Sequence, residues 1–276
     1  MNRLSSEQRA RVVAALVEGN SIRATCRMTG VAKNTVVKLL AELGDACLSY
    51  QDENLRGLHC QRIQCDEVWS FCYAKAKNVP SEHKGEFGFG DVWTWTALDA
   101  DTKLVPCWHV GKRDRHDAAI FIADLAERLA NRVQLTTDGW KPYLNAVEAA
   151  FGSEIDYAML DKLYSGEPEG EKRYSPPKCI GAKRKRIMGN PNAADVSTSY
   201  VERQNLTMRM SMRRFTRLTN AFSKKLENLM HAVSLHFMYY NFARVHRTLG
   251  KTPAMAAGVS DHVWSIDEIV GLLDSN

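Results

Sequence analysis

The chain has 276 residues, of which 45% are hydrophobic and 25% are charged. These proportions are ordinary for a globular protein, and the length suffices for one full domain with a small accessory module. No apolar run approaches the ~20 residues of a bilayer-spanning helix, and no apolar signal core follows the N-terminus, so we expect no membrane partner. Seven scattered cysteines without a C-x-x-C pair predict reduced thiols in a cytosolic protein.

Positive charge is concentrated in one part of the chain. Residues 171–225 contain fourteen Lys or Arg against three acids, a local charge of +11, while the whole chain carries +5 and the remainder therefore −6. Such segregation indicates a polyanionic partner. A solvated basic surface is the alternative.

The first 49 residues predict a small all-helical module. Apolar periodicity indicates helices at 4–18 and 22–28 and a third from Ala32, with Ser21 as the cap of the second. The glycine-containing turn before the third helix matches a helix-turn-helix, which makes the third helix the recognition helix. A plain three-helix packing module is the alternative. The residues that the recognition helix would present to a DNA groove are Lys33, Asn34, Thr35 and Lys38.

After a polar stretch at 50–60, which we interpret as a linker, residues 62–73 alternate between apolar and polar types. This pattern predicts a half-buried strand. Asp66 lies in the middle of it, and an ionised carboxylate there needs a cation, a hydrogen-bond cage or an open site. We interpret Asp66 as a metal ligand, with a solvated acid on an edge strand as the alternative. Glu67 points to the opposite face, and we expect that it cannot readily join the same site.

Further strands are expected at 92–98 and 104–110, followed by an amphipathic helix at 114–130. The next strand starts at Val133, ends at Asp138 and returns beside an earlier strand through a parallel crossover. Active-site groups of open α/β sheets gather at the carboxyl ends of strands, which favours a functional role for Asp138. A capping acid for the following helix is the alternative.

The segment 165–195 follows a helix at 144–151 and a fifth strand at 155–160. Its glycines, prolines and basic run predict an excursion that orders, if at all, on a partner, and a solvated loop is the alternative. The basic run consists of Lys183, Arg184, Lys185 and Arg186.

A helix from about 200 to 212 is expected next, capped by residues 197–199. Glu202, Asn205 and Arg209 share one face of it. A purely structural ion pair within the helix is the alternative for Glu202. A long packing helix at 224–245 should bury His231 and His236 as core residues. The tail, 251–276, should add a short amphipathic helix.

Three short sequence motifs resemble those of a known family. Cys65-Asp66-Glu67-Val68-Trp69, Thr137-Asp138-Gly139-Trp140 and Val201-Glu202-Arg203-Gln204-Asn205 resemble the signatures of the transposase family of the first-described bacterial insertion sequence. Phe222-Ser223-Lys224-Lys225 and His236-Phe237-Met238-Tyr239-Tyr240-Asn241 extend the resemblance to about residue 246. The cysteine pairs of a zinc module found in some relatives are absent. The implied fold is α/β: a ribonuclease-H-like mixed sheet with flanking helices over residues 61–250, preceded by the small all-α helix-turn-helix module.

The resemblance also implies an activity. A DDE transposase binds the terminal repeats of its element and catalyses metal-dependent strand cleavage and transfer of 3′-OH ends to target DNA. Two Mg²⁺ (or Mn²⁺) ions are implied, with Asp66 bridging them and Asp138 and Glu202 each holding one. The residues of the Glu202 helix and its continuation expected to contact DNA are Arg203, Asn205, Arg209 and Arg213.

The implied partners are element ends and target DNA. A homo-oligomer assembled on DNA and a cytoplasmic, nucleoid-associated location in a bacterium are implied as well. Two rival functions stay open: a helix-turn-helix regulator without catalysis, and a nuclease of the same fold that cuts DNA but does not join it.

Overall fold

A computed structural model describes residues 4–164, 179–216 and 220–274 of the chain. The strands are β1 (Arg62–Cys72), β2 (Gly90–Asp99), β3 (Trp108–Gly111), β4 (Gln134–Asp138), β5 (Asp156–Tyr164) and β6 (Cys179–Met188). The α-helices are α1 (Ser6–Val17), α2 (Ile22–Thr29), α3 (Lys33–Asn54), α4 (Arg115–Arg128), α5 (Pro142–Phe151), α6 (Ser199–Ser211), α7 (Leu226–Met238), α8 (Pro253–Ala256) and α9 (Ile266–Gly271). Short 3₁₀ turns occur at Ala76–Asn78, Ser81–His83, Ala193–Asp195 and Arg213–Phe215, and a π-helical turn at Tyr239–Ala243 continues α7.

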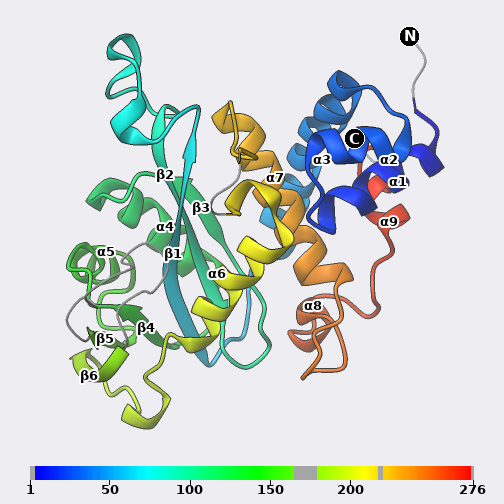
Figure 1. Cartoon of the computed structure of the whole chain (residues 1–276). Coiled ribbons are helices and arrows are strands. Elements are labelled where there is room, and N and C mark those ends of the chain that lie inside the picture. Colours follow the sequence, from blue (N-terminus) through cyan, green and yellow to red (C-terminus); the bar gives the residue numbers. More distant parts are fainter. Residues whose placement is uncertain (1–3, 165–178, 217–219, 275–276) are drawn as a thin grey trace.

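The six strands form one mixed sheet in the order β3-β2-β1-β4-β5-β6 (Figure 1). β1, β2 and β3 form the antiparallel meander expected from the sequence, and β4 and β5 return parallel to β1 through the crossover helices α4 and α5. The expected ribonuclease-H-like sheet with flanking helices, preceded by a small all-helical module, is therefore confirmed.

Each face of the sheet packs against its own helices. On one face Ile63 and Trp95 share a buried cluster with Phe121 of α4 and Tyr143 of α5. On the other face the strand residues Val68 and Leu98 share a second cluster with side chains of α6 and α7. The alternation of side chains along β1 thus divides its residues between two cores, and this division decides which helix each acid of β1 faces.

β3 starts later than the sequence suggests. A strand was expected from Leu104, but the ladder begins at Trp108. The reason lies far along the chain: the side chain of Asn241 accepts a hydrogen bond from the Val105 N–H and donates one to the Val105 carbonyl, both at 3.0 Å. These backbone groups therefore pair with a side chain instead of a neighbouring strand.

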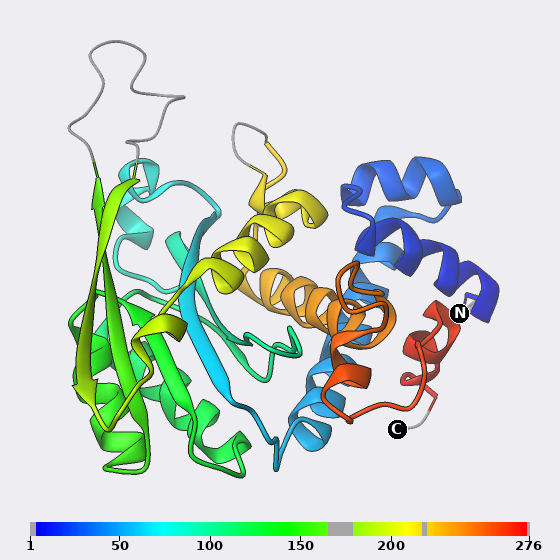
Figure 2. The ribbon, with the colours of Figure 1, turned by 90° about the horizontal axis from the view of Figure 1, so that it is seen from below.

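The N-terminal helices join the rest of the molecule through α3. Residues 50–54 continue this helix, where a linker was expected. Its second half packs along α7, which lies between the N-terminal helices and the sheet (Figure 2). A hydrogen bond from Ser234 Oγ of α7 to the Gly44 carbonyl, 2.7 Å long, marks the close approach of the two helices.

The basic run occupies a strand and not a loop, so the expected excursion at 165–195 is wrong for its described part. Residues 165–178 lie outside the described residues. β6 pairs antiparallel with the edge of β5, a long-range partner that local composition does not reveal. Lysines and arginines are favourable there because charged side chains protect an edge strand from pairing with another chain.

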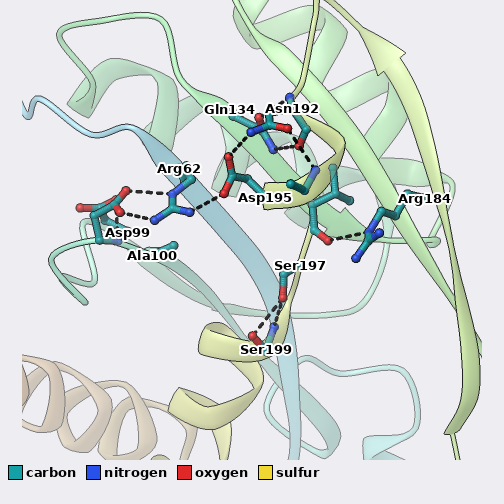
Figure 3. A network of polar contacts seen from close by, with 12 residues as sticks. Arg62, Asp99, Ala100, Gln134, Arg184, Asn192, Asp195, Ser197 and Ser199 are labelled. Carbon is teal, nitrogen blue, oxygen red and sulfur yellow. Dashed lines mark hydrogen bonds and ion pairs between the residues drawn. The ribbon is translucent and has the colours of Figure 1, made fainter. Parts of the chain in front are cut away.

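The segment between β6 and α6 is attached to the sheet by polar contacts (Figure 3). Arg62 Nη1 donates to Asp195 at 2.6 Å, and the Gln134 side chain accepts from the Asn192 N–H at 2.8 Å. Arg184 Nε donates to the Val196 carbonyl at 3.3 Å. These contacts hold the segment that leads into α6 against the sheet.

None of the helices in the described residues is long and apolar enough to cross a membrane. The cysteines are free thiols, as expected, and five of them are buried. His236 is also a core residue as expected: burial lowers its pKa to about 3, so it is neutral in the folded chain.

Candidate active site

A group of carboxylates lies where the sheet splits. β1 and β4 pair only from Arg62 to Gln64, and the two strands diverge beyond that point. Asp66 and Glu67 follow on β1, and Asp138 ends β4. Ligand oxygens of Asp66, Glu67 and Asp138 all lie within 4.8 Å of one another. Carboxylates this close repel one another unless a cation or a proton compensates them.

Asp66 is held by the helix on its own face of the sheet. Asn205 Nδ2 of α6 donates to Asp66 Oδ2 at 2.8 Å. Burial, followed by the charges of Asp138 and Glu202, raises the pKa of Asp66 to about 6. Asp66 is half-buried, and its electronegative environment favours a proton or a cation.

Glu67 belongs to the same group, which contradicts the expectation that it could not join Asp66. It does point to the opposite face, where the Tyr143 hydroxyl and Arg113 Nε (3.1 Å) donate to its carboxylate. Its side chain is 1% exposed, and burial and the charge of Asp138 raise the pKa of Glu67 to about 7. The alternation along β1 holds, but Asp138 lies where β1 and β4 no longer pair, and its carboxylate is within 4.8 Å of both Asp66 and Glu67.

Glu202 lies beside this compact group and not within it. Its Oε1 accepts hydrogen bonds from Lys162 Nζ of β5 and from the Thr198 hydroxyl. Its charge nevertheless raises the pKa of Asp66. For Lys162, burial lowers the pKa, but the bond to Glu202 and the charges of Glu202 and Asp66 raise it overall, so the ammonium stays charged.

Gln64 positions the start of α6. Its side-chain oxygen accepts from the backbone N–H groups of Tyr200, at 2.9 Å, and Val201, at 3.2 Å. The capping expected from residues 197–199 occurs in part: the Thr198 side chain, at the N-cap position, accepts no capping hydrogen bond, but Ser197 Oγ accepts one from the Ser199 N–H at 3.2 Å. A strand residue two positions before Asp66 thus fixes the helix that carries Glu202.

Two cations already neutralise the acids. Arg113 bridges Glu67 and Asp138, with 3.3 Å from its Nη2 to Asp138 Oδ2, and its guanidinium lies 4.9 Å from the Trp140 ring and 5.1 Å from the Trp93 ring. Lys162 pairs with Glu202. Neither cation has a motif that would reveal it in the sequence. Glu67 could have been found from its position next to Asp66.

The donor set fits a hard divalent cation. Mg²⁺ prefers carboxylate oxygens and keeps several waters, so a few acids are sufficient. Asp66 and Asp138 offer oxygens within 4.8 Å of each other, and the ammonium of Lys162 shows that the Glu202 side already accommodates positive charge. Among the described residues, Asp66, Glu67 and Asp138 have ligand oxygens close enough together to hold such an ion, and Glu202 lies beside them.

The expected DNA-binding residues occupy three separate places. Lys33, Asn34 and Lys38 are exposed at the start of α3, and Thr35 is half-buried. The basic run is exposed on β6, where Lys185 pairs with Asp161. Along α6 and the turn after it, Arg203 and Arg213 are exposed, Arg209 is half-buried, and Asn205 is buried with its amide turned to Asp66.

Comparison with known proteins gives no family. Neither the protein-family models nor the curated proteins contain a match. Among solved structures, the Mos1 strand transfer complex aligns with this chain with a TM-score of 0.37 and 11% sequence identity. The alignment covers 100% of this chain and 77% of the Mos1 chain. The piggyBac transposase synaptic complex with hairpin DNA aligns with a TM-score of 0.40 and 13% sequence identity. That alignment covers 100% of this chain and 71% of the piggyBac chain. These values are too low to support an argument about the site, which depends on the chain's own residues.

Proposed function

We propose that this protein is a DDE transposase of a bacterial insertion sequence. The observation that carries the proposal is the cluster of Asp66, Glu67 and Asp138 where β1 and β4 diverge, with Glu202 of α6 beside it and near enough for its charge to raise the pKa of Asp66. Asp66, Asp138 and Glu202 are also the acids in the three sequence motifs that resemble the insertion-sequence family. In this proposal the helix-turn-helix of α2 and α3 binds the terminal repeats, and the acids cut and join strands.

The metal ions, when bound, would make a water or a 3′-hydroxyl more nucleophilic and neutralise charge on the leaving oxygen. We propose two Mg²⁺ (or Mn²⁺) ions held by Asp66, Asp138 and Glu202. The other residues prepare the site: Asn205 orients Asp66, and Gln64 fixes the start of α6.

The exposed basic residues would hold DNA phosphates. Arg203 and Arg213 lie on and after the Glu202 helix, and the run from Lys183 to Arg186 lies on the edge strand β6. Phosphate contacts of this kind position the duplex without reading its sequence. We further propose that the protein assembles as a homo-oligomer on paired element ends, in the bacterial cytoplasm and associated with the nucleoid.

The test follows strand cleavage and joining on duplex DNA that carries the element's own terminal repeat, with Mg²⁺ and with Ca²⁺. We expect Mg²⁺-dependent joining in the wild type and a loss of about a hundredfold or more in Asp66→Asn and Glu202→Gln. Glu148→Gln, a change of an exposed acid on α5, is the matched control and should keep full activity. End binding should persist in all variants.

Three other outcomes would contradict the proposal. Tight end binding without cleavage under any metal would indicate the regulator. Cleavage without joining would indicate the nuclease. Normal joining by Asp66→Asn would show that the acids are not the active site.

A further inference from the structure

Aromatic rings continue from the acid cluster along the same face of β1. Glu67, Trp69 and Phe71 are alternate residues and therefore share this face. The Trp69 and Phe71 ring centroids are 5.7 Å apart, and Phe71 lies 4.7 Å from Phe222, with interplanar angles of 36° and 34°. We call Trp69, Phe71 and Phe222 the ring strip. All three are half-buried, so part of each ring faces solvent.

The ring strip differs from the aromatic core on the same face. Trp95 and Tyr143 are fully buried under α4 and α5. Beyond them the β1–β2 hairpin extends away from these helices toward the short turns of residues 76–83 (Figure 1). The ring strip lies on this extension, where packing under a helix does not account for large aromatic residues.

Cations border the ring strip. Lys224 Nζ lies 4.0 Å from the Phe222 ring centroid and Lys75 Nζ lies 5.9 Å from that of Phe71. The acid opposite Phe71 on β2, Asp91, accepts a hydrogen bond from the Ala76 N–H. Rings flanked by lysines are a surface for a ligand that is flat, apolar on its faces and negatively charged along its length.

The two ends of the ring strip connect two other features. At one end Trp69 is paired in register with Trp93, on whose ring Arg113 lies, and Arg113 binds Glu67 and Asp138. At the other end Phe222 lines a cleft of about 940 Å³ between the N-terminal helices and α7.

That cleft is basic. None of the described residues that line it is acidic, and the cations among them come from both sides of it. They are Arg23, Lys33, Arg213, Arg214, Lys224 and Lys225. The cleft therefore suits a phosphate backbone, and it extends from the start of α3 to the ring strip.

We propose that the ring strip stacks unpaired nucleobases of a DNA strand whose backbone lies in the basic cleft. Stacking suits this surface because every base has a flat π-face, so no particular sequence is needed. Double-stranded DNA cannot use the rings in this way, since its bases are already stacked on one another. The inference rests on the proposed function and deepens it. The DNA strand that reaches the acids would run unpaired along the ring strip toward the helix-turn-helix.

The test measures binding by the full chain, in EDTA so that no strand is cut. A labelled oligo-dT of about 15 nucleotides is compared with an abasic strand of equal length and charge. We expect the wild type to bind the oligo-dT about tenfold more tightly, and Phe71→Leu and Phe222→Leu each to weaken oligo-dT binding about tenfold. Phe71→Trp keeps a ring and should keep the affinity, which separates lost stacking from misfolding.

Tyr200→Leu is the matched control. Its ring is 44% exposed and lies 3.5 Å from Lys103 Nζ, yet it is not part of the ring strip, so its loss should not change binding. Trp69→Phe should keep the affinity but reduce the quenching of tryptophan fluorescence by oligo-dT. Equal binding of oligo-dT and the abasic strand, or unchanged affinity in both leucine variants, would overturn the proposal.

Parallel cleavage assays separate this inference from the proposed function. A chain that joins duplex ends with Mg²⁺ but does not distinguish oligo-dT from the abasic strand retains its function and refutes the stacking. A chain that stacks bases but neither cuts nor joins supports the ring strip and refutes the transposase.

Discussion

One oxygen of Glu202, Oε1, accepts hydrogen bonds from both Lys162 and Thr198. The arrangement keeps the acid in place at the start of α6 and balances its charge. It also places a protein cation where a metal ion would supply the same compensation. Exposed ion pairs contribute little to stability, but this pair is partly shielded, and the charge of Glu202 acts on the half-buried Asp66.

We predict that Lys162→Met makes the protein more dependent on divalent cations. Without the ammonium, the charge of Glu202 acts on Asp66 without compensation, so a bound ion relieves more repulsion. The gain in melting temperature on adding saturating Mg²⁺ should exceed that of the wild type by about 2–4 °C, the shift that about 1 kcal/mol produces in a chain of this size. Thermal unfolding with and without Mg²⁺ measures it.

Lys38→Met is the control, because Lys38 pairs with Glu42 within α3, a helix that contributes no acid to the site. Its Mg²⁺ response should equal that of the wild type. An equal response in Lys162→Met would show that Lys162 does not compensate the site.

At the scale of elements, α6 depends on a residue of the sheet. The first turn of a helix leaves backbone N–H groups without partners, and here the buried side chain of Gln64 accepts two of them. Thr198, which could have capped the helix, is instead free to bind Glu202. One side chain of β1 therefore sets the position of both Glu202 and Asn205 relative to Asp66.

We predict that Gln64→Leu lowers both stability and the response to metal. Loss of the cap should reduce the free energy of unfolding by about 1–2 kcal/mol, measured with urea. The displaced α6 should also reduce the Mg²⁺-induced gain in melting temperature. Gln51→Leu, which removes a second buried glutamine that donates to Cys47 and Ser234, should lower stability while keeping the full metal response. If both variants keep that response, Gln64 does not position the acids.

Local patterns predicted the elements that their own residues determine. Period-2 alternation identified β1, and the carboxyl end of a strand identified Asp138. Elements that depend on distant partners were missed or misplaced: β6 needs the edge of β5, and β3 is shortened by Asn241. The same contrast holds for the residues of the site. Asp66, Asp138 and Glu202 lie in recognisable sequence motifs. The contacts of Arg113, Lys162 and Gln64 join distant parts of the chain and exist only after folding.

At the scale of the whole molecule, the N-terminal helices and the sheet share one core. Val12 and Leu43, of α1 and α3, belong to the same buried cluster as Ile63 of β1 and Leu235 of α7. α9 packs against α1 and so joins the two ends of the chain. The 22-residue helix α3 carries Lys33 and Asn34 at its start and packs on α7 along its second half. The proposed recognition residues are therefore attached to the part of the molecule that holds the acids by a continuous helix and not by a flexible linker.

This attachment depends on Gly44. A Cβ at position 44 would lie 2.6 Å from the Cα of His231 on α7, so the two helices would have to separate. We predict that Gly44→Ala lowers the free energy of unfolding by about 1–3 kcal/mol, the usual effect of overpacking. Because the core is shared, the wild type should unfold in urea in a single transition, seen equally by tryptophan fluorescence and circular dichroism, and the variant should shift that whole transition.

Gly271→Ala is the matched control: a Cβ there meets no atom within 4 Å, so this change within α9 should not lower the urea midpoint and should raise it slightly through the higher helix propensity of alanine. Two separate transitions in the wild type, with Gly44→Ala affecting only one, would mean that the N-terminal helices fold as an independent unit. In that case the start of α3 could take several positions relative to Asp66. A single shifted transition would instead mean that the distance from the recognition helix to the acids is fixed by the fold, and with it the point on the DNA that reaches them.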